Sequence, residues 1–171
     1  MAVSPLSRAA PSAPLTPTRA ARLRAPLFLL LAALLAFEGI GGIVIFVARL
    51  AWGSTPGETL HVLAGAALAL AYAVYQWTHW IRVGALRGRL DWTLGLIAAL
   101  VMALALASGF LLGVPWLRLR LAGDGSPVRY AAALSAFHNV SSMLVLSFVA
   151  AHLGAVLLRD ARARAGRASE D

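Results

Sequence analysis

Four histidines are the residues of this chain whose type and spacing could do chemistry. His61 and His79 lie near the two ends of one apolar segment, and His138 and His152 lie in another; the chain has no other histidine. An ionisable side chain inside a hydrocarbon layer is costly, so its presence there indicates a function by default. A neutral imidazole binds a metal through one ring nitrogen while the other makes a hydrogen bond. The histidines are therefore candidate metal ligands, arranged in two pairs.

The composition places these histidines in a membrane protein. Of the 171 residues, 60% are hydrophobic and only 13% are charged, whereas soluble domains are about half apolar and about a quarter charged. The chain has no cysteine, which excludes disulfides, iron–sulfur clusters, thiolate metal sites and covalent haem attachment. The net charge of +8 comes from arginine without lysine. These arginines flank the apolar segments, so membrane topology explains them and we expect no nucleic-acid partner.

The chain divides into three regions, which are a disordered basic arm over 1–25, a transmembrane domain over 26–159 and a tail over 160–171. The arm is rich in proline, serine and arginine, which disfavours regular structure. The domain contains four apolar segments, each long enough to cross a bilayer core of about 30 Å. These segments cover 26–52, 59–83, 92–116 and 131–159. Short connections between them predict an all-α membrane protein, an up-down bundle of four transmembrane helices.

The arginines predict the orientation of this bundle. Eleven lie in the arm, the loop between the second and third segments and the tail, against three in the loop 117–130 before the fourth segment. Positively charged loops stay in the cytoplasm, so both termini are expected there. The loop 117–130 is then the longest external connection.

The spacing of the histidines places the two on the second helix on one face of that helix, and likewise the two on the fourth helix. The second and fourth helices run in the same direction and are diagonal in the bundle, with His61 and His138 at the outer level and His79 and His152 at the inner level. A gap of 18 residues is five full turns, and a gap of 14 falls about 40° short of four turns. Fourteen residues span about 21 Å, which stacks two sites within one bilayer. We therefore interpret the histidines as two pairs of axial ligands for two haems between these helices.

Glycines on the first and third helices follow the same step. Gly39 and Gly53 are 14 residues apart, and so are Gly95 and Gly109. A bulky macrocycle against these helices needs positions without a Cβ, and the four glycines are candidates for that clearance. The alternative is that they are packing glycines, which are common at any membrane helix interface.

Three charged residues in the membrane segments have two readings each. Arg49, near the outer end of the first helix, and Arg82, at the inner level, are candidates to pair with haem propionates, or else they extend outward to the interface. Glu38 is a candidate for a proton route to a quinone, or else a neutral, hydrogen-bonded core residue.

The pattern of histidines and glycines resembles the four-helix core of the cytochrome b family. The runs LHVLAG, beginning at Leu60, and THWIR, ending at Arg82, also resemble small bacterial four-helix cytochrome b-like proteins. In that family two b-type haems are each ligated by one histidine from each of two diagonal helices. The resemblance implies that His61, His79, His138 and His152 are the axial ligands of two b-type haems.

The second helix departs from the family pattern. The usual step of 14 residues would place a ligand at position 75, where this chain has Tyr75, and His79 lies one turn further on. Either the inner haem is lower, or the two helices are offset, or the inner site is degenerate and one haem binds. His79 could also be an interfacial residue beside Trp80.

The resemblance implies an electron-transfer protein in a bacterial cytoplasmic membrane. It would carry electrons across the bilayer between the quinone pool and a partner redox protein, such as a soluble or membrane-anchored cytochrome or oxidoreductase. Its other partners would be subunits of a respiratory or photosynthetic complex, and it would be a component of such an enzyme rather than an enzyme by itself. The alternatives are a histidine-lined membrane transporter and a structural membrane subunit without two functional haems.

Overall fold

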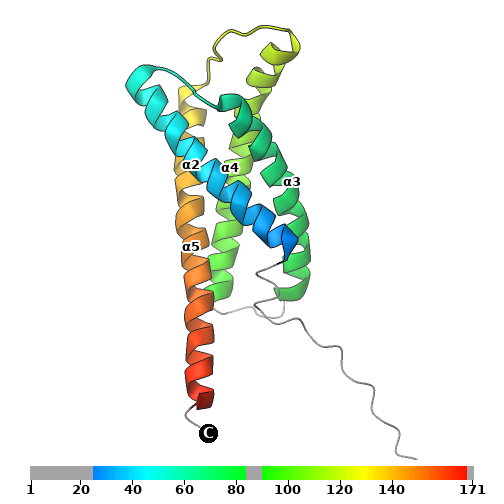
Figure 1. Ribbon diagram of the computed structural model, residues 1–171, viewed down its shortest axis with the longest axis vertical. Coiled ribbons are helices and arrows are strands. Elements are labelled where there is room, and N and C mark those ends of the chain that lie inside the picture. The colour runs from blue at the N-terminus through cyan, green and yellow to red at the C-terminus, as the bar shows by residue number, and fades with distance from the viewer. Residues whose placement is uncertain (1–24, 84–89, 169–171) are drawn as a thin grey trace, which may run out of the picture.

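The computed structural model describes residues 25–83 and 90–168, and in this part of the chain it contains four long helices (Figure 1). They are α2 (Pro26–Trp52), α3 (Glu58–Val83), α4 (Leu90–Leu121) and α5 (Ala132–Ala168). All four contain an apolar stretch long enough to span a membrane. The prediction of an all-α bundle of four membrane-length helices is confirmed, and the chain is a multi-pass membrane protein. The arm predicted over 1–25 lies, except for Ala25, outside the described residues.

The helices run up, down, up and down, and each packs against its two neighbours in the ring (Figure 1). The most extensive contact joins α4 to α5, the next joins α2 to α3, and the contacts between these two hairpins are smaller. Figure 1 shows α2 tilted across the bundle, and its contact with α5 is the smallest of the four between neighbouring helices. The helices α3 and α5, which carry the histidines, are therefore diagonal, as the short loops predict.

Two helices are longer than predicted. The helix α4 continues through Pro115 to Leu121, so residues 117–121, expected in a loop, are helical. Proline removes one backbone hydrogen bond, and near the end of a long helix the other bonds suffice to hold it. Gly123, with φ of 73°, follows the helix and donates its N–H to the Arg120 carbonyl over 3.1 Å. The helix α5 also continues, to Ala168, and projects beyond the bundle (Figure 1).

The core of the bundle is thin and centred on α4 and α5. Met102, Ala105 and Val145 are buried together, with Leu35 and Tyr72 packed against them from the other hairpin. Large apolar side chains such as Leu50, which is 78% exposed, cover the outer faces. An outer surface of this kind is stable in lipid, where close packing rather than burial of apolar area joins the helices.

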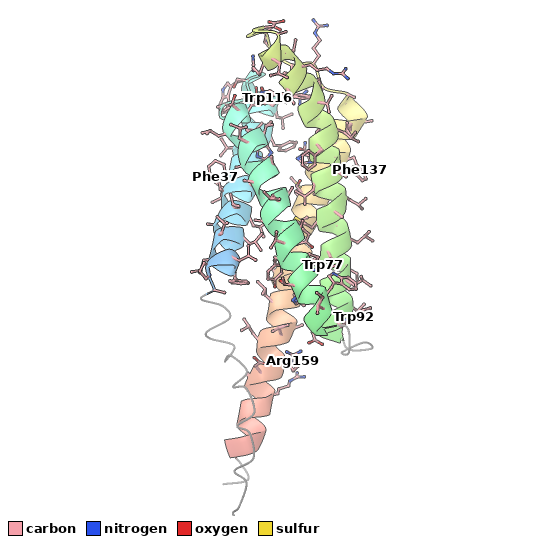
Figure 2. All side chains as sticks on the ribbon, turned by 90° about the vertical axis from the view of Figure 1, so that its right-hand side faces the viewer. Phe37, Trp77, Trp92, Trp116, Phe137 and Arg159 are labelled. Carbon is pink, nitrogen blue, oxygen red and sulfur yellow. The ribbon has the colours of Figure 1, made fainter. Side chains whose placement is uncertain are left out.

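Aromatic side chains mark the two ends of the membrane part. Figure 2 shows Trp116 toward one end of the bundle and Trp77 and Trp92 toward the other. Tryptophan is enriched at membrane–water interfaces because one edge of its ring is polar. Trp77 is largely exposed, as an interfacial residue would be, but Trp116 is buried and turned into the protein.

Candidate functional site

The structure brings His61 and His138 together across the core. Their ring centroids lie 6.3 Å apart, with an angle of 74° between the ring planes. The two residues come from the diagonal helices α3 and α5, near the end of the bundle where α3 and α5 begin. Both side chains are partly buried. This is the outer pair of the sequence interpretation.

The His138 ring is held by the backbone of α4. Its Nδ1 lies 3.1 Å from the carbonyl oxygen of Ala105 and 3.1 Å from the hydroxyl of Ser108. A carbonyl oxygen can only accept, so Nδ1 carries the proton and Nε2 is left with a lone pair. The Ser108 hydroxyl donates to the Leu104 carbonyl over 2.8 Å, which leaves its oxygen available to the ring. Backbone contacts of this kind fix the tautomer and orientation of metal-binding histidines.

Gly109 gives the His138 ring its space. A Cβ at position 109 would lie 3.1 Å from Cε1 of His138, which is closer than ordinary contact. The backbones of α4 and α5 approach each other closely enough at this level that a side chain at position 109 would collide with the ring. The glycine predicted from its spacing therefore faces a histidine directly.

His61 has a different environment, because its Nδ1 faces a carboxylate. The Oε2 atom of Glu38, on α2, lies 2.9 Å from this nitrogen, although the ring N–H is not aligned with it as in a full hydrogen bond. A Cβ on Gly42 would lie 3.4 Å from the His61 ring, and a Cβ on Gly65 would lie 3.4 Å from Oε2 of Glu38. Small residues on both helices thus leave room for the pair.

A cavity of about 470 Å³ lies beside the two histidines, between the hairpins. Its walls come from all four helices and include Gly39, Gly109 and Gly113 along with many apolar side chains. A volume of this size is typical of a site for a small molecule or cofactor.

The cavity wall carries polar atoms that nothing in the described part of the chain satisfies. Four buried side-chain atoms there have no hydrogen-bond partner, and all four belong to residues that line this cavity. They are Glu38 Oε1, His61 Nδ1, Trp116 Nε1 and Ser135 Oγ. Buried polar groups are normally paired, so their concentration on one wall points to a ligand or water that they would bind.

Arg49, Glu58 and Tyr130 form a polar cluster at the end of the bundle where α3 and α5 begin. Tyr130 donates its hydroxyl hydrogen to Oε1 of Glu58 over 2.6 Å, and the Arg49 guanidinium lies 5.5 Å from the centroid of the Tyr130 ring. All three residues line the cavity. Burial, and then the hydrogen bond to Glu58, raise the pKa of Tyr130 well above its ordinary value of 10.0. The cluster joins α2, α3 and the segment before α5.

This cluster makes the stability of the bundle depend on pH at the alkaline end. The folded state holds the Tyr130 proton more tightly than the unfolded state does, so its contribution is complete below pH 10 and declines as the pH rises further. Tyr130→Phe should cost about 1 kcal/mol at neutral pH through the lost hydrogen bond. In thermal unfolding between pH 7 and 11, the variant should lose less stability than the wild type above pH 10. Parallel curves for the two proteins would contradict the assignment.

His79 and His152, predicted as the inner pair, have different surroundings. Nδ1 of His152 lies 2.8 Å from the carbonyl oxygen of Asp91, and a Cβ on Gly95 would lie 2.9 Å from Cε1 of His152. This repeats, 14 residues along both helices, the arrangement of His138 against α4 and Gly109. On α3, however, His79 stacks on Tyr75 with centroids 5.4 Å apart and planes at 15°.

The surroundings of His152 on α5 therefore match those of His138, whereas the surroundings of His79 on α3 differ from those of His61. The Asp91 side chain forms an ion pair with Arg159, which ties the start of α4 to α5. Neither His79 nor His152 is among the described residues that line the cavity.

The remaining predicted site residues are less closely tied to the histidines. A Cβ on Gly39 would meet Leu146, 3.3 Å away. Gly53 ends α2 in the left-handed conformation, with φ of 66° and its N–H donated to the Arg49 carbonyl, and a Cβ there would have no neighbour within 4 Å. A left-handed helix cap by itself accounts for a glycine at this position. The side chain of Arg82 lies outside the part that the structure describes.

Sequence reasoning missed Ser108, Glu58 and Tyr130 as members of the site. The one available signal was that Ser108 directly precedes Gly109 on a helix that was expected to face the histidines. Within the described residues, no group of three or more histidine, cysteine or acidic side chains gathers around one point as a metal cage would require. No protein-family model, curated protein or solved structure matches this chain.

Proposed function

We propose that this protein is a membrane b-type cytochrome that transfers electrons and holds a haem between His61 and His138. The observation that carries the proposal is the pair of imidazoles facing each other across the core, beside a cavity of cofactor size. Haem needs only two protein ligands because the macrocycle supplies the others, so the lack of a larger ligand cluster among the described residues is compatible with it.

The dimensions of the site support this ligand. Two imidazoles that bind one metal ion from opposite sides, each at a metal–nitrogen distance of about 2 Å, have ring centroids about 6 Å apart. The observed separation is 6.3 Å. His138 presents Nε2 as its unprotonated nitrogen because its Nδ1 is engaged by α4. The unpaired polar atoms of Trp116 and Ser135 are suitable donors for a carboxylate group of the cofactor.

A haem bound in this way supplies reversible one-electron chemistry at its iron. If His61 and His138 both held the iron, no position would be left for a substrate, so the protein would conduct electrons rather than catalyse a reaction there. The apolar cavity wall would exclude water. Arg49, which lies over the Tyr130 ring and lines the cavity, would pair with a propionate.

A second, inner haem is part of the proposal in its fuller form. His152, with its Nδ1 on the Asp91 carbonyl and Gly95 against its ring, has the same setting as His138. Its partner would be His79, which would have to turn from its stack on Tyr75. Two haems would carry electrons across the bilayer, between the quinone pool and a partner cytochrome or oxidoreductase in a larger complex. The arginine distribution supports an orientation with both termini in the cytoplasm, and the resemblance to the cytochrome b family supports a bacterial cytoplasmic membrane.

The decisive experiment is a haem count on the purified full-length protein. The protein would be produced in haem-replete cells, extracted in detergent and examined by absorption spectroscopy of the oxidised and reduced forms and of the pyridine complex. We expect a low-spin b-type spectrum with one haem per chain, or two if His79 also binds. A folded but colourless protein would refute the proposal, and metal uptake by vesicles containing it would then support the histidine-lined transporter.

A further inference from the structure

The two outer histidines differ in what their Nδ1 atoms face. Nδ1 of His138 lies against a neutral carbonyl and a hydroxyl on α4, whereas Nδ1 of His61 lies 2.9 Å from the Glu38 carboxylate on α2. The two ligands would therefore differ in electronic character. A carboxylate partner draws the ring proton and makes a histidine a more basic ligand, which a neutral carbonyl does less strongly.

Glu38 has little else to interact with. Its side chain is 11% exposed, at the middle of a membrane-spanning helix, and its second oxygen has no partner among the described residues. The other carboxylates in the described spans have partners elsewhere, since Glu58 accepts from Tyr130, and Asp91 and Asp160 pair with Arg159. A buried carboxylate is costly unless it is paired. Within residues 25–83 and 90–168, Nδ1 of His61 is the group at ion-pair distance from Glu38, so the two side chains depend on each other.

Two glycines make room for the contact between Glu38 and His61. Gly65, one turn along α3 from His61, lies so close to Glu38 that a Cβ there would touch Oε2 at 3.4 Å. Gly42, one turn along α2 from Glu38, has the same relation to the His61 ring. Each partner therefore lies against a glycine on the opposite helix, and α2 and α3 meet closely at this level.

We infer, on the basis of the proposed haem site, that Glu38 is a positioning residue that sets the reduction potential of the outer haem through His61. A carboxylate oxygen 2.9 Å from Nδ1 favours a proton on that nitrogen even without an aligned hydrogen bond, so Nε2 would be the nitrogen that binds iron. Its negative charge also favours the oxidised centre, which carries one more positive charge than the reduced centre. Inside a membrane protein such an interaction is weakly screened. The outer haem thus has a lower potential than its two histidines alone would give it.

The test compares redox titrations of the full-length protein with those of three variants. Glu38→Gln keeps the shape and removes the charge, and we expect the equilibrium constant for reduction of the outer haem to rise at least tenfold, a shift of 59 mV for a one-electron couple. Glu38→Asp keeps the charge on a shorter side chain and should give an intermediate potential. Asp124→Asn is the control, because it removes a carboxylate from the exposed loop after α4, which does not line the cavity or contact a histidine, and it should change the constant less than threefold.

The low-spin ferric EPR spectrum provides a second readout, because it reports the character of the axial imidazoles. We expect it to change in Glu38→Gln and to stay as in the wild type in Asp124→Asn. The inference is overturned if Glu38→Gln leaves both potential and spectrum unchanged, or if both variants shift the potential equally. If Glu38→Gln does not hold haem, Glu38→Asp decides: a wild-type potential and spectrum there would overturn the inference. A wild-type protein without haem would instead refute the proposed function itself.

Discussion

Replacing His138 by alanine should abolish haem binding at the outer site. The imidazole of His138 is fixed by the Ala105 carbonyl and faces His61 at 6.3 Å, so no neighbouring side chain can take its place without moving a helix. Changes in the groups that merely orient a metal ligand cost about 10- to 100-fold in affinity, and loss of the ligand itself should cost more than that. His61→Ala should have the same effect, because both axial positions are needed for a low-spin centre.

The measurement is the haem-to-protein ratio and the low-spin spectrum of each variant after purification. His79→Ala is the informative comparison, since His79 stacks on Tyr75 and does not line the cavity. If the protein holds two haems and His79 is a ligand, two redox waves should become one. If His79 is not a ligand, the titration should be unchanged. Retention of a full low-spin spectrum by His138→Ala would contradict the site, provided that the melting temperature shows an intact fold.

Adding a single methyl group at Gly95 should destabilise the bundle by about 2 kcal/mol, within the range for overpacking of a filled core. A Cβ at this position would lie 2.9 Å from the His152 ring, and the ring cannot easily retreat because its Nδ1 is bound to the Asp91 carbonyl. Gly109→Ala should act in the same direction against His138, with a smaller cost because the contact there is 3.1 Å. In both variants either a helix or an imidazole must move.

Gly113→Ala is the matched control on the same helix. A Cβ at position 113 would lie 3.9 Å from Val62, an ordinary contact distance. Alanine favours a helix over glycine by about 1 kcal/mol, so this variant should be neutral or more stable. Chemical or thermal unfolding in detergent would rank the proteins. Equal stability of Gly95→Ala, Gly109→Ala and Gly113→Ala would mean that the glycines do not make room for the histidines.

The number and type of the helices could be predicted because hydropathy is a local property. Each of the four spans contains enough consecutive apolar residues to identify it without knowledge of its neighbours. The ends of α2 and α3 agree with prediction to within one residue. The ends of α4 and α5 do not, because their last turns are less apolar and the hydropathy pattern no longer marks them; α4 also contains Pro115.

The proximity of His61 and His138 could also be predicted from the sequence. Their depths follow from the ends of the spans and the rise of the helix, and the ring of neighbours follows from the short loops. Gly95 and Gly109 were found for the same reason, since they lie at matching depths on α4. The group that each glycine of α2 faces could not be predicted, because it depends on the rotation of α2 about its axis. Gly39 faces Leu146, and Gly53 is a helix cap.

The sequence by itself determined that this is a membrane bundle of four helices with two levels of histidines, because span length, helical period and loop length are set within each segment. Only the tertiary structure decided how the levels differ. The tilt of α2 brings Glu38 to His61, and the packing of α4 on α5 fixes the rings of His138 and His152 on backbone carbonyls. These contacts depend on rotations and offsets between helices, which arise from the packing of all four and leave no pattern in any one of them.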